Sequence, residues 1–207
     1  MDRQRTNPFV EFLELLADLA ILNVLFLLCC LPVVTAGASL AGLNYAAEKL
    51  RRQEGRPAAN FFRGFRVNFR QATIFWIIFL CLIVFLFLDF YLLIQNGESG
   101  LYLLLLGLVL LWLIFTFVYF YPLLVRFDNK LLRHVRNAFL LSLTHLGRTI
   151  CLTALALAPL LIWMVSGQLL LYTSVFWLLV GFSAAAYCSA LLLRKVFAAQ
   201  MPEERGD

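Results

Sequence analysis

The chain has 207 residues, of which 63% are hydrophobic and 14% charged, and its mean hydropathy is +0.88. Soluble domains are roughly 45–50% apolar and have about a quarter of their residues charged, so this composition excludes an ordinary water-soluble domain. The net charge of +5 does not indicate nucleic-acid binding, because membrane topology and the anionic inner leaflet explain the cations.

Five apolar runs are long enough to be membrane helices, since about 20 residues cross roughly 30 Å of hydrocarbon. They cover residues 15–34, 73–94, 101–125, 149–165 and 172–193, and none contains Lys or Arg. Pro32 and Gly37 should break the first helix, and residues 37–50 then offer a short return helix. We therefore predict an all-α polytopic transmembrane helical bundle of five or six membrane helices, with six preferred.

The cations are distributed unevenly between the connections. The tight turns around residues 95–100 and 166–168 carry none, whereas residues 49–70 carry seven and residues 126–148 carry five. Because Lys and Arg are retained in the cytoplasm, we predict both basic loops and the C-terminus inside and the turns outside. The N-terminus is inside with six crossings and outside with five.

Both basic loops contain an amphipathic stretch that predicts a cytoplasmic interfacial helix. In residues 58–70 one face carries Phe61, Phe62, Phe65 and Phe69 and the other carries Arg63, Arg66 and Arg70. The arginines can contact lipid phosphates or a partner, and the Phe face either enters the acyl boundary or packs on the protein's own helices.

These elements predict one membrane domain over residues 1–207. It consists of the N-terminal and return helices (15–50), an interfacial helix plus hairpin (58–125), a second such unit (130–193) and a cytoplasmic tail (194–207).

Two stripes of small residues predict close helix packing, because small side chains let backbones approach in membranes. They are Ala38, Gly42 and Ala46 in the return helix, and Gly181, Ala185 and Ser189 in the last helix. The alternative is chance, since apolar segments are rich in Ala and Gly.

Motifs for catalysis, phosphate binding or metal ligation are missing, and there are only two histidines. We expect no enzymatic activity, no catalytic residue, no metal and no cofactor, and we interpret the five cysteines as small buried hydrophobic residues. Polar residues at membrane depth are costly and often functional, which makes Asn23, Asn44 and Asp89 a candidate intramembrane polar site. Alternatively, the asparagines cross-link helices and Asp89 reaches interfacial water.

Residues 22–43 (LNVLFLLCCLPVVTAGASLAGL) and 60–73 (NFFRGFRVNFRQAT) resemble the YesL-like family of uncharacterised bacterial membrane proteins. The most specific features are Leu22-Asn23, Leu31-Pro32, Thr35, Gly37, Ala38 and Ser39. Phe26 stands where Trp is common in the family. The resemblance implies a multi-pass protein of the bacterial cytoplasmic membrane whose relatives often accompany carbohydrate-uptake systems, with no established activity.

The favoured function is a non-enzymatic accessory or scaffold protein associated with a carbohydrate-uptake system. Its expected partners are membrane lipids and either sugar ABC importer subunits or a second copy of itself, with no nucleic acid. The alternative is a small solute transporter or channel.

Reporter fusions test the predicted topology. Fusions at Asn96 and Gly167 should report the outside, and fusions at Arg56, Lys130 and Glu203 the inside, because the cations stay in the cytoplasm. An outside signal at Lys130 would contradict the topology.

Overall fold

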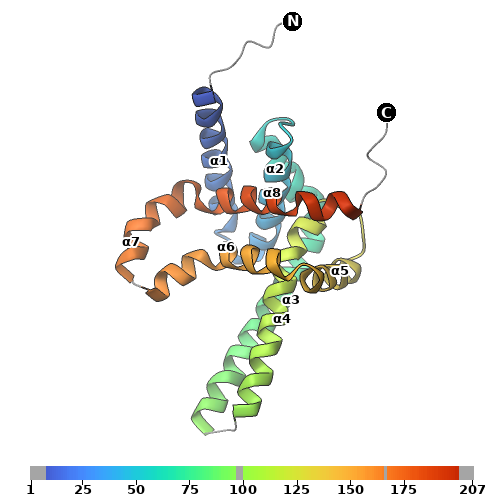
Figure 1. Cartoon of the computed structure of the whole chain (residues 1–207), viewed down its shortest axis with the longest axis vertical. Coiled ribbons are helices and arrows are strands. Elements are labelled where there is room, and N and C mark those ends of the chain that lie inside the picture. The colour runs from blue at the N-terminus through green and yellow to red at the C-terminus, as the bar shows by residue number, and fades with distance from the viewer. Residues whose placement is uncertain (1–7, 97–99, 166, 201–207) are drawn as a thin grey trace, which may run out of the picture.

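The computed structural model describes residues 8–96, 100–165 and 167–200, and all regular structure in these ranges is helical (Figure 1). The helices are α1 (Pro8–Cys30), α2 (Ala36–Arg51), α3 (Pro57–Asn96), α4 (Gly100–Leu124), α5 (Leu131–Thr144), α6 (Leu146–Val165), α7 (Gly167–Phe176) and α8 (Phe182–Gln200), with short turns η1 (Val33–Thr35) and η2 (Trp177–Gly181).

The predicted all-α membrane class is confirmed. Four described helical segments are long and apolar enough to cross a membrane, and α5 with α6 makes a fifth if this pair, bent by 112°, is one span. Parts of the predicted turns (97–99 and 166) and the end of the predicted tail (201–207) lie outside the described residues.

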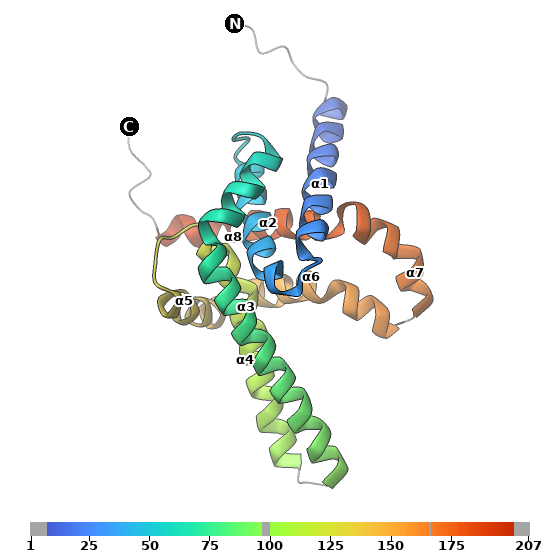
Figure 2. The same ribbon diagram turned by 180° about the vertical axis from the view of Figure 1, so that it is seen from behind.

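The α1–α2 hairpin forms where the sequence predicts a break. α1 ends at Cys30 because a residue before proline, here Leu31, is disfavoured in helical conformation. The Thr35 hydroxyl then donates to the carbonyl oxygens of Cys29 at 2.7 Å and Pro32 at 2.9 Å. These bonds close the turn, and α2 returns beside α1 (Figure 2).

The prediction of a separate surface-lying helix over residues 58–70 is wrong. This segment is the first part of α3, a single helix of 40 residues. No proline or glycine interrupts the chain between Gly64 and the end of α3, so nothing stops helix propagation. Phe61 is fully buried and packs against α2 residues, whereas Phe62 and Phe69 remain exposed.

Glycines on both helices bring α2 and α3 into close contact. A Cβ added at Gly42 would lie 2.9 Å from the Phe61 carbonyl oxygen, and one at Gly37 would lie 2.6 Å from the Ala72 carbonyl oxygen. On the opposite helix, a Cβ added at Gly64 would collide with the Tyr45 side chain. The α2–α3 pair is therefore held together by backbone contact that larger residues would prevent.

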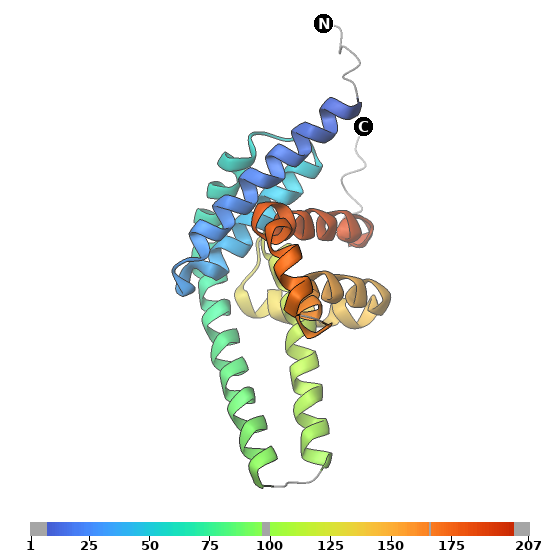
Figure 3. The same cartoon turned by 90° about the vertical axis from the view of Figure 1, so that its left-hand side faces the viewer.

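The α3–α4 hairpin extends away from the other helices (Figures 1 and 2). Stacked aromatic rings join the two helices at the base of the hairpin. The ring centroids of Phe75 and Phe120 are 3.5 Å apart, and those of Phe79 and Phe117 are 4.5 Å apart. Beyond this base lie residues 80–95 of α3 and 100–111 of α4, which we call the arm. α6 and α8 run across the direction of the arm, and α7 connects them at the edge of the molecule (Figures 1 and 3).

The remaining helices surround the base of the arm. α5 packs against the end of α4. α7, η2 and α8 follow one another directly, and the helical path bends between α7 and α8 (Figure 1). The five cysteines are free, but Cys81, Cys151 and Cys188 are exposed. The prediction that all five are buried is thus wrong, because these three lie on outward helix faces.

Gly42→Leu should destabilise the protein, because overpacking a tight contact typically costs about 1–3 kcal/mol. The matched control is Gly107→Leu, at an arm position where an added Cβ meets nothing within 4 Å. Thermal unfolding of the purified protein in detergent measures both. Equal melting temperatures for the two variants would contradict the close α2–α3 contact.

Candidate functional site

A hydrogen-bonded junction ties α1 to the turn before α8. Asn23 is fully buried, and its Nδ2 donates to the carbonyl oxygens of Trp177 at 3.0 Å and Leu178 at 2.7 Å. Its Oδ1 accepts the backbone N–H of Ser183 at 3.0 Å. The η2 segment is a π-helical turn, where backbone bonds shift from i+4 to i+5 spacing. The Asn23 amide therefore bonds backbone groups at and just after this irregular turn.

Ser183 strengthens the same junction. Its hydroxyl donates to the carbonyl oxygens of Leu19 at 2.7 Å and Val180 at 2.8 Å. Leu19 lies one helical turn before Asn23, so two turns of α1 are fastened to η2 and α8. In an apolar environment such bonds are the main directional interaction between helices.

Gly181 leaves the space that the Trp177 ring occupies. A Cβ at Gly181 would lie 2.4 Å from Trp177 Cε3, so the ring covers Gly181 directly. The ring also contacts Phe182, at 5.4 Å between centroids. Any side chain at Gly181 would displace the indole.

A cavity of about 240 Å³ lies beside the junction, between α1, α2, α4, α6, η2 and α8. Aromatic and aliphatic side chains form most of its wall, including Phe26, Phe117 and Phe182. Its polar lining residues are Asn44, Tyr121, Trp177 and Ser189. No Asp, Glu, Lys, Arg or His is among the described residues that line it.

Two of the polar side chains lack hydrogen-bond partners. Tyr121 and Trp177 are 2% and 9% exposed, yet neither the Tyr121 hydroxyl nor the Trp177 Nε1–H has a partner in the described structure. By contrast, Asn44 Nδ2 donates to Leu40 O at 2.8 Å and Ser189 Oγ donates to Ala186 O at 2.7 Å. Buried polar groups are normally paired, so the two unpartnered groups distinguish this cavity from ordinary packing defects.

Prolines interrupt two helices at the same cavity. Pro122 in α4 and Pro159 in α6 have no backbone N–H, so the carbonyls of Val118 and Leu155, four residues earlier, lose their usual helical donors. Val118 and Leu155 both line the cavity. Irregular backbone from α4, α6 and η2 thus meets around one space.

An ion cluster lies next to this space, at the polar end of α2. Glu48 Oε1 lies 2.7 Å from Arg51 Nη2, 3.0 Å from Arg52 Nε and 3.3 Å from Arg126 Nη1. Burial disfavours the ionised Glu48, but its hydrogen bonds to Arg51 and Arg52 and the charges of Arg126 and Arg51 outweigh burial and lower its pKa. A pocket of about 20 Å³ lined by Glu48 and Arg126 shares Asn44, Pro122 and Ser189 with the cavity.

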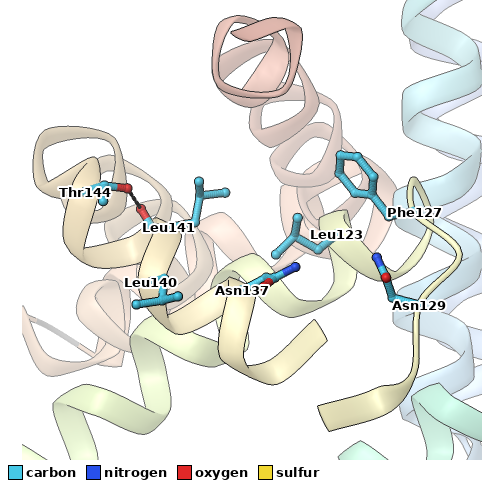
Figure 4. Close-up of a pocket in the computed structure, with 7 residues that line it drawn as sticks. All are labelled: Leu123, Phe127, Asn129, Asn137, Leu140, Leu141 and Thr144. Carbon is cyan, nitrogen blue, oxygen red and sulfur yellow. Dashed lines mark hydrogen bonds between the residues drawn. The ribbon is translucent and has the colours of Figure 1, made fainter. Parts of the chain in front are cut away.

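A larger hollow of about 330 Å³ lies between the end of α4 and α5 (Figure 4). Its Asn129 is already engaged, because the backbone carbonyl accepts Gln71 Nε2 at 3.1 Å and Oδ1 accepts Arg133 Nη1 at 3.3 Å. Thr144 donates to Leu141 O at 3.1 Å. The cavity with unpartnered donors is the better candidate site.

The structure does not bring the three predicted intramembrane polar residues together. Asn23 is in the junction, Asn44 lines the cavity, and the half-buried Asp89 is in the arm, seven residues before the end of α3. The described His, Cys, Asp and Glu side chains form no group of three or more that could hold a metal ion.

The predicted packing residues occupy two different settings. Ala38, Gly42 and Ala46 are buried in α2, and Gly42 faces α3. In the second stripe the Trp177 ring covers Gly181, while Ala185 and Ser189 line the cavity. The predicted contact residues Arg63, Arg66 and Arg70 are exposed on α3.

Tyr121, Trp177 and Glu48 were not predicted as site residues. The only sequence signals near Tyr121 and Trp177 are Pro122, which follows Tyr121 directly, and Gly181, four residues after Trp177. Aromatic residues are too common in apolar runs for these signals to stand out.

Part of the chain matches a known protein family. Residues 19–90 match the model of a family described as "Protein of unknown function, DUF624". The DUF624-matching segment runs from α1 through α2 into α3, so it includes Asn23 and the closely packed glycines but not the walls that α4, α6 and α8 contribute. Neither a curated protein nor a solved structure matches the chain.

Asn23→Leu should destabilise the protein by about 1–3 kcal/mol, because it leaves buried backbone groups at η2 and α8 without partners. The matched control is Asn68→Leu, since Asn68 is half-buried and bonds only Gly64 O within its own helix. Thermal unfolding in detergent compares them. A loss no greater for Asn23→Leu than for Asn68→Leu would contradict the junction.

Proposed function

We propose that this protein is a non-enzymatic accessory subunit of a larger membrane assembly. The observation that carries the proposal is the arm, which extends beyond the other helices with little of its surface covered (Figures 1 and 2). In the most apolar 18-residue stretch of each helix, 6% of α3 and 11% of α4 is buried inside the protein, compared with 22% of α1. The arm therefore offers a large apolar surface to another molecule.

The length of α3 indicates that a protein, and not lipid alone, covers the apolar surface of the arm. Its 40 residues extend for about 60 Å at 1.5 Å per residue, twice the roughly 30 Å thickness of the hydrocarbon core. The first part of α3 packs against the apolar α1–α2 hairpin and the second part is the arm. One bilayer cannot cover both parts if α3 crosses it steeply.

The directions of the candidate spans support the same inference. Residues 171–194 form a candidate span along α7 and α8, and α8 runs across the arm (Figure 3). Helices that span one bilayer tilt by about 0–40° from its normal, so crosswise helices cannot all be spans. We infer that a membrane protein partner contacts the arm, while lipid covers the α7–α8 surface.

A basic surface offers a second contact. Arg63, Arg66 and Arg70 are exposed on α3, and Lys130, Arg133 and Arg136 are exposed at α5. The bond from Gln71 to Asn129 O fastens α3 to the segment that leads into α5, so the two groups belong to neighbouring elements. This surface suits an acidic partner segment or anionic lipid, at about 1 kcal/mol per cation.

The finer proposal is that the assembly is a carbohydrate-uptake system, with sugar ABC importer subunits as the partner. Its support is the resemblance of residues 22–43 to YesL-like proteins, whose genes often accompany such systems. The DUF624 match over residues 19–90 is consistent with that resemblance. On this basis the protein belongs in a bacterial cytoplasmic membrane with its C-terminus inside.

A photo-crosslinking residue placed on the arm tests the proposal in native membranes. Positions Phe87 and Leu104 are 69% and 60% exposed, and the control positions Leu171 and Val175 on α7 are 72% and 61% exposed. We expect adducts with a second protein from the arm positions and lipid adducts alone from α7, with mass spectrometry identifying the partner.

Lipid adducts alone at all four positions would contradict the accessory role, and an adduct with a second copy of this chain would indicate self-association. In the same membranes, replacing Arg63, Arg66 and Arg70 by Gln should lower recovery of the partner without changing thermal stability. Recovery with the wild-type chain should fall as salt rises, because exposed charges are screened.

A solute transporter or channel is the second candidate. It is favoured by the cavity at which two proline-interrupted helices and a π-turn meet, since broken helices form the binding sites of many transporters. Unlike the accessory role, it requires no second protein.

A further inference from the structure

The cavity beside the Asn23 junction has the chemistry of a ligand site, independently of any protein partner. Its lining combines aromatic rings with four polar side chains and holds no charged residue among those described. A charged ligand would lose its hydration without gaining a counter-charge. The lining therefore selects a neutral molecule with an apolar part.

The two unpartnered groups define what else the ligand must carry. The Trp177 indole can only donate a hydrogen bond, and the Tyr121 hydroxyl can donate one; both are buried without partners. Leaving such groups unpaired destabilises the empty protein. Acceptor oxygens of a ligand would remove this cost, and the Asn44 amide and the Ser189 hydroxyl, both in the cavity wall, can accept bonds from ligand hydroxyls.

The surrounding structure holds Trp177 in place. Asn23 bonds the Trp177 carbonyl at 3.0 Å, and the absence of a side chain at Gly181 lets the indole lie over that residue. The backbone and ring of the donor are thus held before any ligand arrives. Such preorganisation lowers the entropy lost on binding.

We propose that the cavity binds the oxygen-bearing head of a small neutral amphiphile, with the Tyr121 hydroxyl and the Trp177 Nε1–H donating to its oxygens. The apolar part packs against Phe26, Phe117 and Phe182. Neutral hydroxyl oxygens occur both on bilayer amphiphiles, such as monoacylglycerols, which also carry ester oxygens, and on water-soluble polyols. The volume of about 240 Å³ suits a head group rather than a whole lipid.

The experiment uses the full chain in phosphatidylcholine nanodiscs and a monolauroylglycerol with a photoreactive diazirine next to its head group. Labelling should be saturable and map to peptides that contain Tyr121 and Trp177. Unlabelled monolauroylglycerol should compete, and laurate and dodecylammonium of the same chain length should compete at least about tenfold less well. Competition by myo-inositol, which has no apolar part, would show that a water-soluble polyol fits the site and would overturn the assignment to an amphiphile, whereas its absence would support a bilayer source.

The double variant Tyr121→Phe/Trp177→Phe should weaken labelling about tenfold, as expected for two neutral hydrogen bonds. The matched control is Tyr102→Phe/Trp112→Phe, which changes the same residue types at exposed positions of α4 and should label like the wild type. No saturable labelling, equal competition by laurate, or labelling unchanged in the first variant would overturn the proposal.

Thermal unfolding without probe separates binding from a structural role. Tyr121→Phe should unfold at or above the wild-type temperature, because its hydroxyl has no partner to lose. Added monolauroylglycerol should then raise the unfolding temperature of the wild type more than that of the variant. A clear drop for Tyr121→Phe without probe would show that the hydroxyl is structural and would overturn its assignment as a ligand donor.

Discussion

The bond from Asn23 to the π-turn is the interaction on which the position of α8 against α1 depends. A π-turn exposes backbone groups that water cannot satisfy in an apolar interior, and Asn23 reaches the carbonyls of Trp177 and Leu178 at 3.0 and 2.7 Å. Asn23 lies in α1 and the turn directly precedes α8. This one side chain therefore joins the first and the last of the described helices. The position of Trp177, and through it one wall of the cavity, follows from that bond.

A second constraint is the close approach of α2 and α3. Glycines at positions 37, 42 and 64 remove side chains where the backbones meet, so α3 is directed along α2 before it continues into the arm. The Glu48 cluster then joins the end of α2 to Arg126, just past the end of α4. The α1–α2 hairpin and the base of α4 are therefore joined by close packing and ion pairs, whereas most of the described side chains of the arm are exposed.

These constraints place two different surfaces on one small protein. The arm presents an apolar exterior, which fits a role within an assembly, and the cavity is a partly open pocket between helices with unpartnered donors, which fits a small ligand. The two are separate in space, because the cavity lies at the junction of α1, α2, α4, α6 and α8. Binding in the cavity and docking of the arm can therefore be present or absent independently, although α4 takes part in both.

Composition and periodicity by themselves determined the membrane class, the helical runs and the break at Pro32, because these depend on hydropathy and on local backbone sterics. They failed for residues 58–70, where amphipathicity cannot distinguish a helix lying on a membrane from one whose Phe61 packs on α2. They also marked Asn23 as costly without naming its partners, which lie more than 150 residues away in sequence. Only the tertiary structure decided that Asn23, Asn44 and Asp89 are apart and that Tyr121 and Trp177 share a cavity. Which residues come close in space depends on long-range packing between helices, and no local sequence pattern encodes that packing.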